Sequence, residues 1–240
     1  MSKINITFKG KKYAIDKSLL AGAMSSLEGA LVELEQGGVV AGNATFDDGV
    51  TLTWDQLKLE ENGDYYGYNA SSISDISIDG FYNCSSIISI TIPSSVTTIE
   101  TAAFKNCYNL MNITIPDSVM EIGEEAFQGC YFTNIILPRN LTNISRYTFT
   151  DCSNLETIII PDSVTSIGDS AFCGCSKLTS VVIPDGVTSI GDYAFSNCNI
   201  LTSITYEGTV AEWNTIQNGE NWNYMVPATY VQCSDGTVEL

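Results

Sequence analysis

A repeat of 22 or 23 residues constrains this chain more than any other feature of its sequence. Prolines stand at positions 93, 116, 138, 161 and 184, and a Phe-x-x-Cys sequence follows each of them. A fixed period of this length is typical of a solenoid, in which each repeat is one coil of chain stacked on the next. We therefore expect one long core that runs through all the coils.

The repeats begin before the first proline, because residues 70–76 align with residues 93–99. Six repeats result, over residues 70–92, 93–115, 116–137, 138–160, 161–183 and 184–206. Equivalent positions are apolar in every repeat, so stacking turns them into buried columns. Two such columns are Ile76, Ile99, Ile122, Ile144, Ile167 and Ile190, and Phe81, Phe104, Phe127, Phe149, Phe172 and Phe195.

Three local patterns recur within each repeat. The residues before each proline alternate between apolar and polar, which predicts a short strand, and Val-Thr-x-Ile predicts a second extended segment. Ala-Phe-x-x-Cys predicts one helical turn, with Asp169 and Asp192 at the N-cap position. Asn, Gly or Asp precedes each of the repeated cysteines, and these residue types tolerate the left-handed conformation that ends a helix.

The third repeat is one residue shorter than the others. Phe132 is expected to take the position that Leu110 and Leu155 fill in other repeats, so that the loop after Cys130 absorbs the deletion. A slip inside the strand would instead turn its core side chains outward.

The segments that flank the repeats predict smaller units. Residues 1–38 form a ββα pattern, with a hairpin over 4–15 and a helix from Asp16 or Ser18 to about Glu35. Residues 39–69 are interpreted as an N-terminal cap or linker, with a second hairpin over 44–54 and a short helix over 54–61. Residues 207–240 are interpreted as a C-terminal cap, because a solenoid needs atypical ends to cover its core.

Composition excludes several classes of function. The formal net charge is −18, which disfavours nucleic acid and anionic lipid as partners. Histidine is absent, which removes imidazole from catalysis and from metal sites. No apolar run is long enough to span a membrane, and residues 1–10 do not resemble a secretory signal. The chain is then cytoplasmic, exported by another route, or separated from a leader.

Eight cysteines allow three interpretations: a column of buried thiols, disulfides, or a zinc site. The parallel stacking of six of them, together with the need for four converging thiolates around zinc, favours the buried column, while Cys173 and Cys233 lie outside it. The aspartates suit turns and caps, since the nonapeptide of a calcium ladder is absent. We therefore expect no metal and no cofactor.

The repeated pattern Ile-Pro-x-x-Val-Thr-x-Ile-Gly-x-x-Ala-Phe-x-x-Cys-x-x-Leu-x-x-Ile resembles the BspA-like (Treponema pallidum type) leucine-rich repeat family over residues 70–206. The expected fold is an α/β solenoid, a right-handed leucine-rich repeat superhelix with short strands, single-turn helices and two caps. The resemblance implies a bacterial cell-surface or secreted protein that adheres to host matrix proteins or to other bacterial surface proteins. Residues 1–69 lie outside it.

Outward positions of the strands before the prolines are the best binding candidates, because this is the usual binding face of a solenoid. The alternative interpretation is β-propensity at half-exposed positions, or cover by the N-terminal unit. Trp213, Trp222, Tyr224 and Tyr230 either form an aromatic platform for a ligand or close the end of the core. The candidate residues of the strand face are Thr114, Ile136, Ile159 and Val182, with Asn112, Asn134, Thr157 and Ser180 beside them.

The sequence thus predicts a non-enzymatic module that binds a protein partner through its strand face. A second hypothesis is structural: the N-terminal unit docks the solenoid on an envelope or a phage-derived particle. A third is a hydrolase with paired carboxylates, which the many acidic residues permit but no spacing supports. No catalytic residue is assigned.

Overall fold

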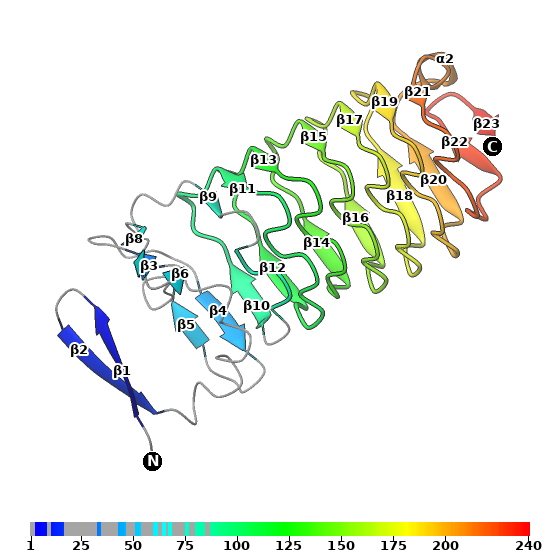
Figure 1. Ribbon diagram of the computed structural model, residues 1–240. Helices are drawn as coiled ribbons and strands as arrows, with labels where there is room; N and C mark the ends of the chain where they lie inside the picture. The colour runs from blue at the N-terminus through cyan, green and yellow to red at the C-terminus, as the bar shows by residue number, and fades with distance from the viewer. Residues whose placement is uncertain are drawn as a thin grey trace.

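The repeats form an elongated solenoid whose coils stack side by side (Figure 1). The computed structural model describes residues 75–76, 80–84 and 87–240 in full, and the backbone of eight short strands between residues 3 and 68. Each coil is named by its residue range, which begins at one of the repeated cysteines, as in coil 107–129 and coil 130–151.

One strand of each coil lies on the same side of the solenoid and pairs in parallel with its neighbours. We call the outer surface of these strands the strand face. Side chains alternate between inward and outward along each strand, so that Ile135 and Ile158 are buried between exposed neighbours. The strands are β10 (Ile87–Thr91), β12 (Asn112–Thr114), β14 (Asn134–Ile136), β16 (Thr157–Ile159), β18 (Ser180–Ile183) and β20 (Ser203–Tyr206).

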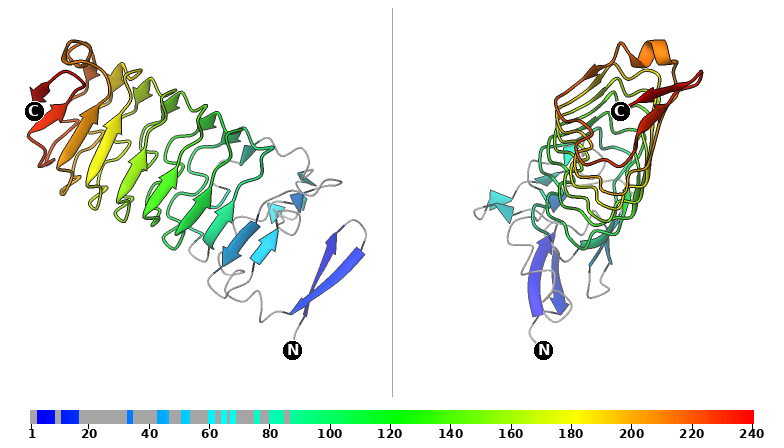
Figure 2. Two further views of the ribbon diagram at one scale, coloured as in Figure 1. Left: turned by 180° about the vertical axis from the view of Figure 1, so that it is seen from behind. Right: turned by 90° about the vertical axis from the view of Figure 1, so that its right-hand side faces the viewer.

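Two-residue strands form the opposite side of the coil, as the view along the solenoid shows (Figure 2). Glycine follows most of them because neighbouring backbones approach closely there: a Cβ on Gly168 would lie 2.6 Å from the Arg146 nitrogen. These strands are β9 (Asp75–Ile76), β11 (Thr98–Ile99), β13 (Glu121–Ile122), β15 (Asn143–Ile144), β17 (Ser166–Ile167), β19 (Ser189–Ile190) and β21 (Gln217–Asn218).

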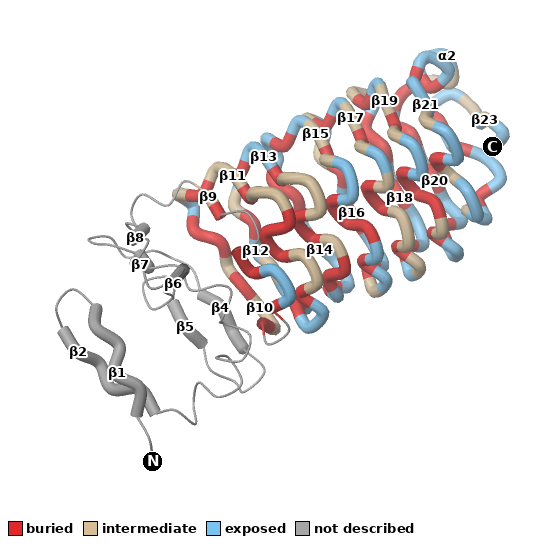
Figure 3. The backbone as a smooth tube through the Cα atoms, viewed as in Figure 1, coloured by how far each residue is buried: buried red, intermediate tan, exposed pale blue. Residues whose placement is uncertain are grey.

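The predicted columns form the core, and buried backbone runs through every coil (Figure 3). The six phenylalanine rings stack nearly parallel, with centroids 5.0 to 5.7 Å apart. The cysteine column lies beside them, and all eight cysteines are free thiols. The Cys175 Sγ donates to the carbonyl oxygen of Phe149 at 3.2 Å, and four other thiols of the column repeat this contact one coil apart.

The predicted single-turn helices are wrong: Ala-Phe-x-x-Cys forms a run of turns. Ser170 and Gly174 both have positive φ, four residues apart, and the equivalent residues of other coils do as well. Because left-handed residues interrupt a helix, alternate N–H groups close i→i−3 turns, and the others donate to the next coil. For example, Cys173 donates to the Ser170 oxygen and Phe172 to the Ala194 oxygen.

The predicted N-cap residues have no helix to cap, because their segment is a run of turns. The Asp169 carboxylate accepts from the backbone N–H of Asp192 at 2.9 Å, and Asp192 accepts from Glu220 at 2.6 Å. Each aspartate therefore caps a neighbouring coil instead of a helix of its own. The left-handed conformation of the residue before each column cysteine is confirmed from Asn83 to Asn197.

Phe132 accommodates the short repeat as predicted, but both sheets lose a ladder of backbone hydrogen bonds there. Phe132 is fully buried and meets Phe127 and Phe149 edge-on, at 6.0 and 6.4 Å. Within residues 107–151, β12 has no ladder to β14 and β13 has none to β15. Every other pair of neighbouring coils from residue 84 onward keeps both ladders. We call the junction between coil 107–129 and coil 130–151 the seam.

Both hairpins predicted before the repeats are present. Strand β1 (Lys3–Phe8) pairs antiparallel with β2 (Lys11–Asp16), and β4 (Asn43–Phe46) with β5 (Thr51–Thr53). Strand β4 also pairs antiparallel with β10, which adds two strands to this end of the sheet. The boundaries proposed for the units 1–38 and 39–69 stay predictions.

The two helices predicted before residue 70 lie largely outside the described residues, over 17–32 and 54–59. Their last residues are strands instead, because they pair with other chain segments. Strand β3 (Glu33–Leu34) pairs in parallel with β8 (Gly67–Tyr68), and β6 (Glu60–Glu61) pairs antiparallel with β7 (Asp64–Tyr65).

The C-terminal segment closes the core as a degenerate seventh coil. Helix α2 (Val210–Trp213) starts with a capping box between Thr209 and Glu212, and its Trp213 is buried. Trp222 packs edge-on against Phe195 at 6.2 Å. Strand β22 (Tyr230–Gln232) continues the sheet in parallel from β20, and β23 (Thr237–Glu239) returns antiparallel.

Candidate functional site

The strand face brings the predicted binding residues together in two rows. Register places Ile136 opposite Ile159 and Ile159 opposite Val182. Ile136 and Ile159 are each 73% exposed and Val182 is 44% exposed, so these three side chains form an apolar row across neighbouring strands. Thr114 is exposed on β12, on the far side of the seam from Ile136.

Polar uncharged side chains form the second row, parallel to the first. Asn134 lies opposite Thr157, Ser180 lies opposite Ser203, and all are exposed. Asn112 is exposed on β12. Amide and hydroxyl groups at these positions are able to donate or accept hydrogen bonds with a partner.

Two exposed residues, Tyr230 and Gln232, extend these rows. The sequence did not predict that they belong to the strand face. Val231 pairs with Ile204 and is buried, so Tyr230 and Gln232 point outward on β22. Tyr230 thus belongs to the polar row, and it is 49% exposed. The alternation of Tyr-Val-Gln is a strand signal, but residues 207–240 do not follow the repeat that would have aligned it.

The remaining aromatic candidates separate into two groups. Trp213 and Trp222 are buried at the end of the core, with ring centroids 5.9 Å apart. Tyr224 is 54% exposed and lies in the run of turns, where its oxygen accepts from the Asn197 N–H at 2.8 Å, whereas Tyr230 lies on β22. The four residues therefore do not form one platform, and the two tryptophans cover the core as the second interpretation expected.

Acidic side chains border the strand face at both ends of its strands. Asp162 and Asp185 follow β16 and β18, and both are exposed. Glu207 follows β20 directly, and Glu156 directly precedes β16. None of these four takes part in an ion pair with another described residue.

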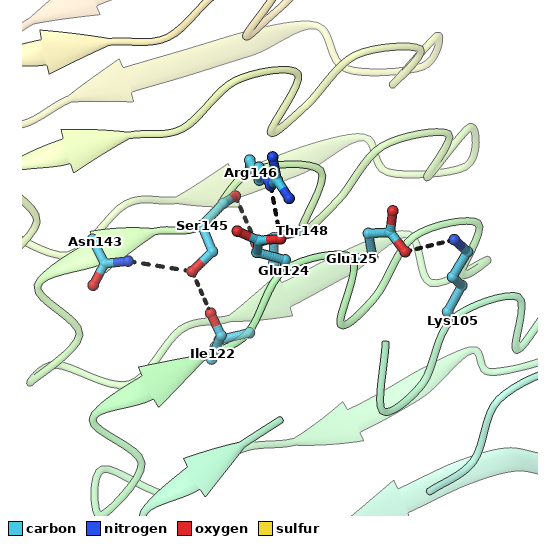
Figure 4. A network of polar contacts seen from close by, with 8 residues as sticks. All are labelled: Lys105, Ile122, Glu124, Glu125, Asn143, Ser145, Arg146 and Thr148. Carbon is cyan, nitrogen blue, oxygen red and sulfur yellow. Dashed lines mark hydrogen bonds and ion pairs between the residues drawn. The ribbon is translucent and has the colours of Figure 1, made fainter. Parts of the chain in front are cut away.

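The basic side chains of the described coils concentrate instead around the seam (Figure 4). Arg146 contacts Glu124 at 2.7 Å, Lys105 contacts Glu125 at 2.6 Å, and Arg139 contacts Asp117. The backbone N–H and then the guanidinium of Arg139 lower the pKa of Asp117, since both donate to its carboxylate. Glu124 in turn raises the pKa of Arg146.

Burial makes five of the thiols poor nucleophiles. Burial raises the pKa of Cys198 to about 12, and raises the pKa of Cys130, Cys152 and Cys175 well above the usual range. Burial also raises the pKa of the half-exposed Cys173. A thiol with a raised pKa stays protonated at neutral pH, and the thiolate is the reactive form.

Two other features are absent from the described residues. Within residues 75–76, 80–84 and 87–240, no group of three Cys, Asp or Glu side chains is arranged to hold a metal ion. The same part of the chain contains no helix of the length and apolarity that a membrane crossing requires.

These stacked coils, their parallel strands and the ladder of turns define a leucine-rich repeat solenoid. A family model described as BspA type leucine rich repeat region matches residues 74–202 in six copies. The chain belongs to this family. No curated protein sequence matches the chain.

The solved structures that are similar to the chain include two bacterial leucine rich proteins. A leucine rich cell surface protein from Faecalibacterium prausnitzii is 40% identical, with a TM-score of 0.53, over 54% of this chain and 35% of that one. The leucine rich repeat protein of T. pallidum is 28% identical, with a TM-score of 0.59, over 71% of this chain and 75% of that one. The chain therefore spans about a third of the first structure and three quarters of the second.

Proposed function

We propose that this chain is a non-enzymatic module of a bacterial surface protein that binds a protein partner through its strand face. The observation that carries the proposal is the apolar row, in which Ile136 and Ile159 are neighbours and each is 73% exposed. Binding would bury this apolar surface, at roughly 25 cal/mol for each Å² removed from water. The partner is a host matrix protein or a surface protein of another bacterium.

Two further observations support this function. Exposed rows of equivalent residues along a solenoid form extended binding surfaces in other repeat proteins. A structure similar to this chain is a cell surface protein of F. prausnitzii, which supports a surface location.

The test compares two double variants of the whole chain. Ile136→Asp with Ile159→Asp places two charges in the apolar row, whereas Met120→Asp with Ile200→Asp makes the same kind of change at exposed residues off the strand face. Binding is measured by surface plasmon resonance on purified extracellular-matrix proteins and by retention of the chain on intact bacteria.

The proposal predicts that the row variant loses at least about tenfold in affinity while the control variant keeps it. Both variants should retain the wild-type urea midpoint, because the changed side chains are exposed. Equal binding by the wild type and the row variant on every partner would overturn the proposal.

A further inference from the structure

The charge of the solenoid is distributed unevenly along its length, and this distribution bears on the partner. Residues 152–240 contain ten acidic residues and one basic residue, Lys177. The three basic residues between positions 87 and 151 all contact carboxylates. The acidic residues of the C-terminal coils therefore have almost no internal compensation, and their field extends into solvent.

The strand face of these coils is itself uncharged. Its outward residues on β12, β14, β16, β18, β20 and β22 are Asn, Thr, Ile, Ser, Val, Tyr and Gln. The charges lie at the rim, with Asp162 and Asp185 after their strands and Glu156 before β16. Arg139 stands at the equivalent position after β14, where it pairs with Asp117. Lys177 precedes β18 and so lies at the opposite strand ends from Asp162 and Asp185.

An apolar centre inside a polar rim is the usual anatomy of a protein interface. We propose that the partner presents a basic surface to the strand face, with an apolar centre against Ile136, Ile159 and Val182 and with Lys or Arg side chains against the rim formed by Asp162 and Asp185. This inference rests on the proposed function and adds the chemistry of the partner. The apolar row spans about 10 Å at the usual strand spacing, which suits a short extended segment.

Charge also argues against a second copy of this chain as the occupant. Two strand faces that met would bring four rim carboxylates of Asp162 and Asp185 into one interface. Like charges at an interface repel one another and suppress that partner. A basic partner meets the same carboxylates with attraction, which speeds association in particular.

The experiment selects binders by the strand face and then reads their charge. A random 12-residue peptide library displayed on phage is selected for binding to the full chain. Phage that also bind the double variant Ile136→Ser, Ile159→Ser are removed. Serine keeps the charge of the chain unchanged. The retained peptides are sequenced, and the best are synthesised and measured by surface plasmon resonance at two salt concentrations.

Two matched variants then separate rim contacts from overall charge. Asp162→Asn with Asp185→Asn removes two carboxylates at the rim. Glu121→Gln with Glu220→Gln removes two exposed carboxylates that lie away from the strand face. Glu121 lies on β13, on the opposite side of the coil, and Glu220 follows β21. We expect basic peptides, an affinity loss of about threefold to tenfold in the rim variant, and a smaller loss in the control.

Three results would overturn the inference. Peptides that need the strand face but are neutral or acidic would leave the proposed function standing and exclude a basic partner. Equal losses in the rim and control variants would mean that the attraction is a property of the whole chain. If no peptide distinguishes the wild type from the serine variant, the proposed function fails and the inference fails with it.

Discussion

The seam and the regular junctions join neighbouring coils in different ways. At a regular junction, such as that between β18 and β20, both sheets and the run of turns continue from one coil to the next. At the seam only the turns continue, through bonds such as Phe127 N–H to the Thr148 oxygen at 3.0 Å. The solenoid therefore tolerates the loss of sheet pairing where its core columns and its turns persist.

Two residues distinguish the seam from the regular junctions. The missing residue after Tyr131 brings the larger Phe132 ring into the core, and the stack widens there to 5.7 Å between Phe127 and Phe149. Ser145 stands where glycine stands in Gly123, Gly168 and Gly191. Glu100 also replaces this glycine, but its backbone N–H still donates to the Ile76 oxygen at 2.9 Å. The Ser145 hydroxyl donates to the Ile122 oxygen at 2.6 Å, in place of the backbone bond that Gly168 makes to Ile144.

The largest expected effect is at a regular junction. Phe172→Ala should cost about 3–5 kcal/mol, because the ring is fully buried and stacks on Phe149 and Phe195 at 5.3 and 5.1 Å. Phe132→Leu at the seam should cost roughly 1 kcal/mol, since leucine fills this position elsewhere. Urea unfolding measures both, and a loss below about 1 kcal/mol for Phe172→Ala would contradict the column assignment.

Adding a Cβ to a regular junction tests whether close backbone approach keeps the ladder. Gly168→Ala should cost roughly 1–3 kcal/mol, because the new Cβ would lie 2.6 Å from the Arg146 nitrogen. Hydrogen exchange should accelerate at β15 and β17, which would convert this junction into a second seam. Unchanged exchange there would mean that Ser145 does not cause the missing ladder.

Alkaline pH should destabilise the core on the C-terminal side of the seam. Burial raises the pKa of Cys152 and Cys198, so stability is complete below the unfolded thiol pKa of about 8.5 and falls as pH rises toward the folded values. Each thiol should contribute a loss of about 1.4 kcal/mol per pH unit in this window. Urea midpoints from pH 8 to 10 measure it, with Cys198→Ala as the variant that should show a shallower slope.

A matched pair of serines tests the single hydroxyl link at the seam. Ser145→Ala should cost about 0.5–1.5 kcal/mol and speed exchange in neighbouring coils, because its hydroxyl bond has no ladder beside it. Ser163 makes a similar bond to the Leu141 oxygen at 2.6 Å, beside an intact ladder. Ser163→Ala should leave exchange at that junction unchanged, and equal effects would show that the seam is no weaker.

The smallest expected effect is that of the ion pairs across the seam. Arg139→Gln and Arg146→Gln should each lower the urea midpoint only slightly, since both side chains are largely exposed. The cost should vanish in 1 M salt, where the screening length is about 3 Å. A cost that survives high salt would show that the contacts act by packing instead of by charge.

Sequence periodicity predicted the stacking because each column consists of one residue type in six repeats. It located the deletion at Phe132, and it placed Ile136, Ile159 and Val182 on one face through strand alternation. Those inferences need only the register of each repeat against the next. The same register carried the position of the turns and the left-handed residues before each cysteine.

Periodicity could not distinguish a helical turn from a run of turns. The decisive residues are Tyr147, Ser170 and Tyr193, whose positive φ is not signalled by their residue type. Bonds to the next coil stabilise that conformation, such as Ser170 N–H to the Asp192 oxygen at 2.7 Å. A contact between coils outweighed the local preference, and Tyr230 was missed because its coil departs from the repeat.

The C-terminal coil also determines how the solenoid meets its own copies. Asn218 pairs with Ile190 and so ends the isoleucine column with an amide, while Trp222 lies across the last phenylalanine. Stacked columns of one residue type would otherwise offer a template on which another molecule could continue the array. Strand β23 turns back on β22 and occupies the sheet edge. We therefore expect this end to stop fibre growth, and the chain to resist end-to-end polymerisation at high concentration.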